Sequence, residues 1–265
     1  PLAGVDPPPR STVIPAPISA GEIVRRTLGT TLLVVTLIVL LTRGDSAFLY
    51  LAGQGAALAV VYLSITIITG LAGHISLCQG SFAAVGAFTT YQLAARYDTS
   101  VLVGAVAGAL VAAAVGALLS VPLVRLSGVW IAIATLAFAF FFDAVMVKFS
   151  WTGAPTGVAT GDLVVPRPVI GPWDMASDKS FLAFLLAVLA IATVAVMLLA
   201  RSTTGRMLGA TRGSEIAAQS IGISPTRARV LAFSIAAGLA GLGGALLVIQ
   251  QESVNYDTNF APFAA

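Results

Sequence analysis

Long apolar stretches, separated by short polar segments, make up most of this chain and restrict what it can fold into. A helix rises ~1.5 Å per residue and needs ~20 apolar residues to cross ~30 Å of hydrocarbon. A helix also pairs its own backbone groups, so it satisfies them where lipid offers no partner. We therefore predict an all-α, polytopic transmembrane helical bundle with about seven spans: Thr27–Thr42, Phe48–Gly70, Ile75–Ala95, Val101–Val124, Val129–Phe149, Ser180–Ala200 and Ala228–Gln250.

The composition supports this class and argues against others. Hydrophobic residues make up 58% of the chain and charged residues 9%, whereas soluble domains carry about a quarter charged residues. A nucleic-acid-binding surface needs clustered Lys and Arg on a soluble module, and only two lysines are present. The single cysteine, Cys78, excludes an intrachain disulfide and any multi-cysteine metal site. We expect neither nucleic-acid binding nor a metal site.

The distribution of basic residues predicts the orientation in the membrane. If the segment 201–227 faces the cytoplasm and the spans alternate, nine of the 14 basic residues lie inside and the other five outside. This excess predicts a multi-pass protein of the plasma (inner) membrane with a cytoplasmic N-terminus. The segment 150–179 is then an outer loop.

We divide the chain into a tail and a membrane domain. Residues 1–22 are rich in proline and are predicted to be a disordered tail. Residues 23–265 contain all the predicted spans. The chain ends at Ala265, soon after the seventh span, so we expect it to be a fragment with further spans missing.

Small residues recur at helical spacing in two of the spans. Membrane helices associate closely where small side chains let their backbones approach. In the fourth and seventh spans, the predicted packing positions are Gly104, Gly108, Gly116 and Gly241. We expect these glycines to hold the bundle together, a role that requires no contact with a solute.

The start of the third span does not read as a plain spanning helix. Gly70–Ser81 is rich in glycine and polar residues, which predicts a broken helix. Broken helices expose backbone groups near the bilayer middle, where transporters bind solutes. Ser76, Gln79 and Ser81 are therefore candidates for a polar pathway, although hydrogen bonds between helices would explain them equally well.

Two further polar residues have open roles. His74, the only histidine, is either a loop residue at the level of the lipid headgroups or a proton carrier. Asp143 is the one acid predicted inside a span, where a carboxylate is costly. It lies near Lys148 in sequence, so a paired aspartate is at least as good an interpretation as a functional one.

The polar segment between the last two spans predicts a short surface helix. Ser214 can cap a helix over Glu215–Ile221, and Gly222 can end it in a left-handed turn. Ser224 can then cap the last span, with Pro225 at its first position. The small and apolar side chains of this helix suit a groove on another protein, although a simple connecting loop is the alternative.

The pattern Glu215-x-Ala217-Ala218-x-x-x-Gly222 resembles the EAA signature of ABC importer permeases, whose coupling helix docks on the ATPase subunit. The chain as a whole resembles the LivM-type permeases of branched-chain amino-acid ABC importers. Four ordered blocks carry this resemblance: Gly70–Phe88, Gly128–Phe140, Thr152–Gly157 with Pro166–Pro168, and Arg201–Ser224 running into LAFSIAAGLAGLGGAL.

The resemblance implies an ABC importer permease fold over residues 23–265 and a role in importing leucine, isoleucine or valine. It implies three kinds of partner besides membrane lipid: a second homologous permease, two cytoplasmic ATPases and an extracytoplasmic solute-binding protein. The chain has no G-x-x-x-x-G-K-[ST] motif, so we expect no enzyme activity and no cofactor here, with ATP and Mg²⁺ on the ATPases. Glu215, Ala217, Ala218 and Gly222 are the implied coupling residues. The predicted pathway residues are Ser76, Gln79, Ser81, Phe82, Thr135, Leu136 and Phe138.

Other functions remain open from the sequence. Permeases for urea or short-chain amides share the same sequence blocks. An ion-coupled secondary transporter would carry acids within its spans, where only Asp143 fits. A membrane scaffold without transport activity would need neither the broken third span nor the EAA-like helix.

Overall fold

A computed structural model describes residues 45–97, 99–126, 128–145, 163–164, 169–170, 173–174 and 177–254. The chain divides into two compact units, 1–44 and 45–265, and every described residue belongs to the second unit. The predicted tail over 1–22, the first predicted span and most of the predicted outer loop therefore lie outside the described residues.

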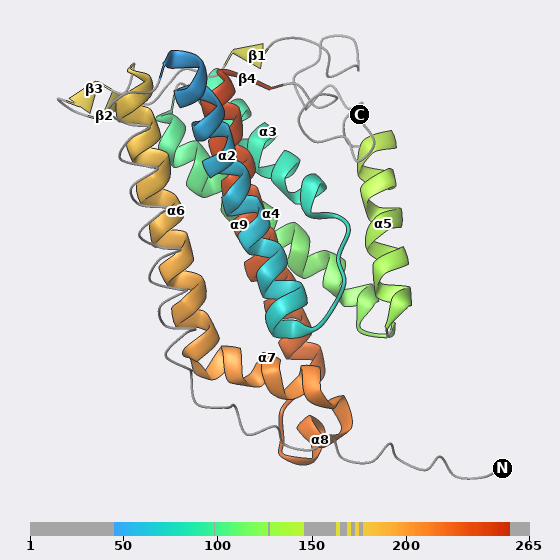
Figure 1. The fold of residues 1–265 in the computed structure, drawn as a ribbon. Coiled ribbons are helices and arrows are strands. Elements are labelled where there is room, and N and C mark those ends of the chain that lie inside the picture. Colours follow the sequence, from blue (N-terminus) through green and yellow to red (C-terminus); the bar gives the residue numbers. More distant parts are fainter. Residues whose placement is uncertain are drawn as a thin grey trace, which may run out of the picture. The chain divides into compact units, whose positions relative to one another are not determined.

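The second unit is built from helices (Figure 1). The described residues also form four strands of two residues each: β1 (Leu163–Val164) pairs antiparallel with β4 (Ser253–Val254), and β2 (Val169–Ile170) pairs antiparallel with β3 (Trp173–Asp174). The helices, in chain order, are α2 (Ser46–Ile65) continuing into the π-helix η1 (Thr66–Ala72), α3 (Gln79–Tyr97), α4 (Val101–Leu123), α5 (Val129–Ala144), α6 (Asp178–Arg201), α7 (Thr203–Gly213), α8 (Glu215–Ser220) and α9 (Pro225–Gln251).

Four stretches of helix within the described part of the chain are long and apolar enough to cross a membrane. They are Ser46–Ala72, Val101–Leu123, Asp178–Arg201 and Pro225–Gln251, and each coincides with a predicted span to within a few residues. Helix α5 is apolar but has 16 residues, or about 24 Å of helix at 1.5 Å per residue. The predicted fifth span begins at the same residue, and its last four residues, 146–149, lie outside the described part of the chain.

Helix α9 lies at the centre of this unit and packs against α2, α3 and α4 (Figure 1). In the most apolar stretch of α9, 72% of the residues are buried, whereas 17% are buried in the most apolar stretch of α6.

Glycines allow these helices to approach closely. A Cβ added to Gly108 would lie 2.5 Å from the Gly86 carbonyl oxygen. A Cβ added to Gly116 would lie 2.4 Å from the Ala237 Cβ, and one added to Gly241 would lie 2.4 Å from the Ala112 Cβ. At Gly104 the nearest atom, the Thr90 carbonyl oxygen, is 3.1 Å away. These helices touch through their backbones, as small residues allow.

The helix breaks between η1 and α3. Gly73 has a left-handed backbone (φ +74°), and its N–H and that of His74 both donate to the Ile68 carbonyl. Residues 73–78 are not helical, and α3 begins at Gln79. The prediction that the third span begins at Ile75 is wrong in its first turn. Residues Ile75–Cys78 are not helical, because the left-handed residue Gly73 redirects the chain.

The two ends of α9 meet different parts of the chain. At its C-terminal end, Gln250 Nε2 donates to the Tyr50 carbonyl near the start of α2 at 3.2 Å, and β4 pairs with β1. At its N-terminal end, α9 contacts α7 and α8. Strand β1, within the segment 150–179, therefore lies at the opposite end of α9 from α8 (Figure 1).

Candidate functional site

Four buried polar side chains from three parts of the chain gather around the helix break; we call Ser64, Ser76, Gln79 and Thr135 the polar cluster. The Ser64 hydroxyl donates to Gln79 Oε1 at 2.9 Å, and Gln79 Nε2 donates to Ser76 Oγ at 3.4 Å. The N–H of Leu77 donates to the Thr135 hydroxyl at 3.1 Å. Helix α5 thus supplies an acceptor to backbone that has left the helix, which apolar surroundings require.

The polar cluster offers hydroxyls and one amide, groups that both donate and accept hydrogen bonds. In this conformation Ser64, Gln79 and Ser76 bind one another and Thr135 bonds to backbone groups, and all four side chains are at most 8% exposed. The cluster is therefore closed to a solute unless the surrounding helices move. Ser76, Gln79 and Thr135 are predicted pathway residues, and the structure brings them together. Ser64 was missed, because no spacing in the sequence connects it with Gln79.

The predicted apolar pathway residues lie beside the polar cluster on α3 and α5. Phe82 is fully buried, and its ring centroid lies 5.9 Å from that of Phe138. Ser81 is buried and Leu136 is half-buried. The α3–α5 contact therefore unites a polar and an aromatic portion of the predicted pathway.

Helix α7, which the sequence reading did not predict, contacts the break directly. Arg212 Nη1 donates to the Gly70 carbonyl near the end of η1. An added Cβ on Gly73 would lie 2.6 Å from Arg212 Cγ, so the glycine serves both the left-handed turn and this close approach. A movement of α7 would reach the broken span through this contact.

His74 follows this turn and stacks on Phe233 of α9, with ring centroids 6.5 Å apart. Burial lowers the pKa of His74 below its usual 6.5, and the nearby Arg229 guanidinium lowers it further against the opposing effect of the Glu215 carboxylate. The imidazole is therefore neutral at pH 7. Asp143 is half-buried on α5, and Lys148 lies outside the described residues.

Helix α8 has the predicted caps. The Ser214 hydroxyl accepts from the Ala217 N–H at 3.2 Å. At the other end, Gly222 has φ +83° and the Ile223 N–H donates to the Ala218 carbonyl at 2.9 Å. Both cap predictions, and the cap of α9 by Ser224, are confirmed.

The side chains of α8 divide into an inner and an outer set. Ala218 is 2% exposed, whereas Ile216 on α8 and Ile221 directly after it are 79% and 70% exposed. Two large apolar side chains in water suit a groove on another protein. Glu215 accepts a hydrogen bond from Arg229 Nη2 at 2.6 Å, a pairing that the sequence did not predict.

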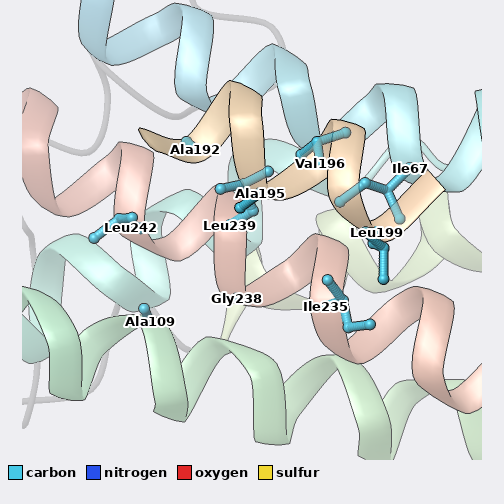
Figure 2. A pocket seen from close by; sticks show the side chains of 10 residues that line it. All are labelled: Ile67, Ala109, Ala192, Ala195, Val196, Leu199, Ile235, Gly238, Leu239 and Leu242. Atoms are coloured by element: carbon cyan, nitrogen blue, oxygen red, sulfur yellow. The ribbon is translucent and has the colours of Figure 1, made fainter. Parts of the chain in front are cut away.

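A separate groove of about 370 Å³ lies between α6 and α9, closed by parts of η1 and α4 (Figure 2). The groove is lined by apolar side chains and one glycine: Ile67, Ala109, Ala192, Ala195, Val196, Leu199, Ile235, Gly238, Leu239 and Leu242. No predicted pathway residue lines it. Because it has no polar side chain, it cannot recognise the charged groups of an amino acid.

Comparison with known proteins gives one family. Residues 47–265 match the family described as branched-chain amino acid transport system / permease component. The chain is 31% identical over 228 residues to the high-affinity branched-chain amino acid transport system permease protein LivM of Salmonella typhimurium, and equally to that of Escherichia coli. Each match covers 76% of this chain and 53% of the relative, so the chain spans about half the length of these curated relatives. No solved structure matches it.

Proposed function

Since this chain belongs to the branched-chain amino acid transport permease family, we propose that it lines part of the pathway of an ATP-driven importer for leucine, isoleucine and valine. The observation that carries the proposal, beyond the family, is the contact between the helix break and the segment 201–227. Arg212 of α7 holds the Gly70 carbonyl and packs on Gly73. A cytoplasmic motor that moves this segment would thereby act on the polar cluster.

The pathway opens in this proposal by rearrangement around the break. Within the described chain, the backbone of 73–78 has few partners: the Leu77 N–H bonds to Thr135, the Gly73 and His74 N–H groups bond to Ile68, and the Cys78 carbonyl accepts from the Phe82 N–H. A displacement of this segment would separate Ser76 from Gln79 and open a path to the start of α3, where the first N–H groups of a helix have no intrahelical partner. Free N–H groups at a half-helix start favour a carboxylate. Phe82 and Phe138 would then contact an apolar side chain of the solute.

The partners follow from the same reading. Ile216 and Ile221 suit insertion into one of two cytoplasmic ATPases, which would bind ATP and Mg²⁺. A second homologous permease would complete the pathway, and an extracytoplasmic solute-binding protein would deliver the solute at the end where β1 and β4 pair. The N-terminus would lie in the cytoplasm. ATP-driven closure of the ATPases would then switch access between two states that are coupled over a distance.

Reconstitution tests this function. The full importer, with both permeases, both ATPases and the solute-binding protein, is placed in liposomes, and uptake of radiolabelled leucine is measured with and without ATP. We expect uptake only with ATP and the ATPases. Uptake that needs no ATPase would establish a secondary transporter instead. Competition by unlabelled urea or acetamide, with none by isoleucine, would reassign the solute to the amide class.

A further inference from the structure

Arg229 is a buried cation at the start of the central helix. Its side chain is 3% exposed, although it lies in the second turn of α9 at the same end as α8. Nη1 donates to three carbonyl oxygens at the end of α4: Leu123 at 2.8 Å, Val124 at 2.9 Å and Leu126 at 3.1 Å. Nη2 donates to Glu215 Oε1 at 2.6 Å. One guanidinium thus joins α4, α8 and α9.

The electrostatics explain why this charge is tolerated. The last carbonyls of a helix have no intrahelical partner and carry the negative end of its dipole, so α4 supplies part of the countercharge. The Glu215 carboxylate supplies the rest, and its side chain is 45% exposed. The bond therefore connects a fixed buried cation with an anion at the surface, where a partner protein can reach it.

Few other polar interactions connect helix α8 with the spans. Among the described residues, the Glu215–Arg229 pair is the one side-chain hydrogen bond or ion pair that joins α8 to another helix. The buried Nε of Arg229 has no partner in the same part of the chain. The guanidinium is therefore held through its two outer nitrogens alone, Nη1 by carbonyls at the end of α4 and Nη2 by Glu215.

The same face of α9 leads to the helix break. Phe233 lies four residues after Arg229, which puts both side chains on one face of the helix. The Phe233 ring stacks on His74, directly after the left-handed residue Gly73. Two contacts, Glu215 with Arg229 and Phe233 with His74, are thus joined through one turn of α9.

We propose that Arg229 is the positioning residue through which α8 acts on the spans, its ion pair with Glu215 transmitting displacement of α8 to α4 and to the break. This inference rests on the proposed function and adds the residue that carries the coupling. It also changes the role of Glu215: the carboxylate serves Arg229 of its own chain, and Ile216 and Ile221 remain as the contacts for the ATPase.

The test uses the reconstituted importer and measures leucine uptake and ATP hydrolysis in the same vesicles. Arg229→Lys keeps the positive charge but loses the planar guanidinium that reaches four acceptors. Glu215→Gln keeps the shape of the side chain but loses its negative charge. Arg227→Lys, at an exposed position two residues earlier, is the matched control. Each of the first two variants should lower leucine moved per ATP by about three- to tenfold, as expected for loss of a partly exposed charge-assisted bond. The double variant should lose no more than Arg229→Lys alone, because Arg229→Lys already breaks the ion pair that Glu215→Gln removes.

The outcomes separate the inference from the function. If wild-type protein shows ATP-driven uptake and both variants move as much leucine per ATP, the inference is wrong and the function stands. A lower yield or melting temperature with an unchanged ratio would assign the pair a purely structural role and also refute the inference. If Arg229→Lys fails to fold, Glu215→Gln alone decides, because it leaves the α4 carbonyls with their donor. Absence of ATP-driven uptake by wild type would instead refute the proposed function.

Discussion

Replacing Gly222 with valine tests whether the left-handed end of α8 matters for docking. Gly222 has φ +83°, and an added Cβ would meet no atom within 4 Å. The side chain has room, so the cost comes from the backbone alone. A left-handed residue other than glycine costs roughly 1–2 kcal/mol, and a β-branched side chain lies at the upper end of that range.

This cost is large for a helix of this size. Helix α8 has six residues, and isolated helices shorter than about 12 residues are marginal. Because ~1.4 kcal/mol is a tenfold change in population, Gly222→Val should weaken binding of the ATPase to the membrane-embedded permease by about five- to thirtyfold. Helices α2–α6 and α9 should keep their thermal stability, since none of their atoms lies within 4 Å of the Cβ added at position 222.

Titration of the ATPase onto the permease in nanodiscs measures this effect. Gly222→Asn is the matched control, because asparagine tolerates the left-handed conformation and should lose only a small part of the affinity. Gly209→Ala, at a site with open space and ordinary backbone, should bind as wild type does. Wild-type affinity for Gly222→Val would refute the assignment of α8 as the docking helix.

Three further predictions concern the spans and the break. Gln79→Leu removes hydrogen bonds within the polar cluster; it should spare assembly and reduce leucine uptake, and equal uptake would make Gln79 a packing residue. Gly108→Ala puts a Cβ 2.5 Å from a backbone oxygen; it should lower stability by about 1–3 kcal/mol in a thermal melt, whereas Gly55→Ala, in open space, should not. Because the pKa of His74 is lowered in the folded state, mainly by burial and then by Arg229, the unfolded state binds more protons, so stability should fall as pH drops through 6.5. His74→Asn should remove that part of the pH dependence, and an unchanged pH profile would contradict the neutral buried imidazole.

Hydropathy and capping could be read from the sequence alone. The predicted last span, Ala228–Gln250, lies within α9, and Ser224 caps that helix as expected. The caps of α8 at Ser214 and Gly222 also follow the prediction. These features depend on side chains within a few residues of one another, and on the length of an apolar run, so local chemistry determines them.

Other features required the tertiary structure. Gln79 and Thr135 were predictable as polar residues within spans, but the partner of Gln79 on α2 lies 15 residues away and the Leu77–Thr135 bond joins residues 58 apart. Arg229 entered the sequence argument only as one positive charge among 14. Its carbonyl acceptors, at the end of α4 and in the residues just after it, lie over 100 residues earlier in the chain. A buried charge takes its partners from whatever the packing brings near it, and no local pattern of residues records which helices will meet.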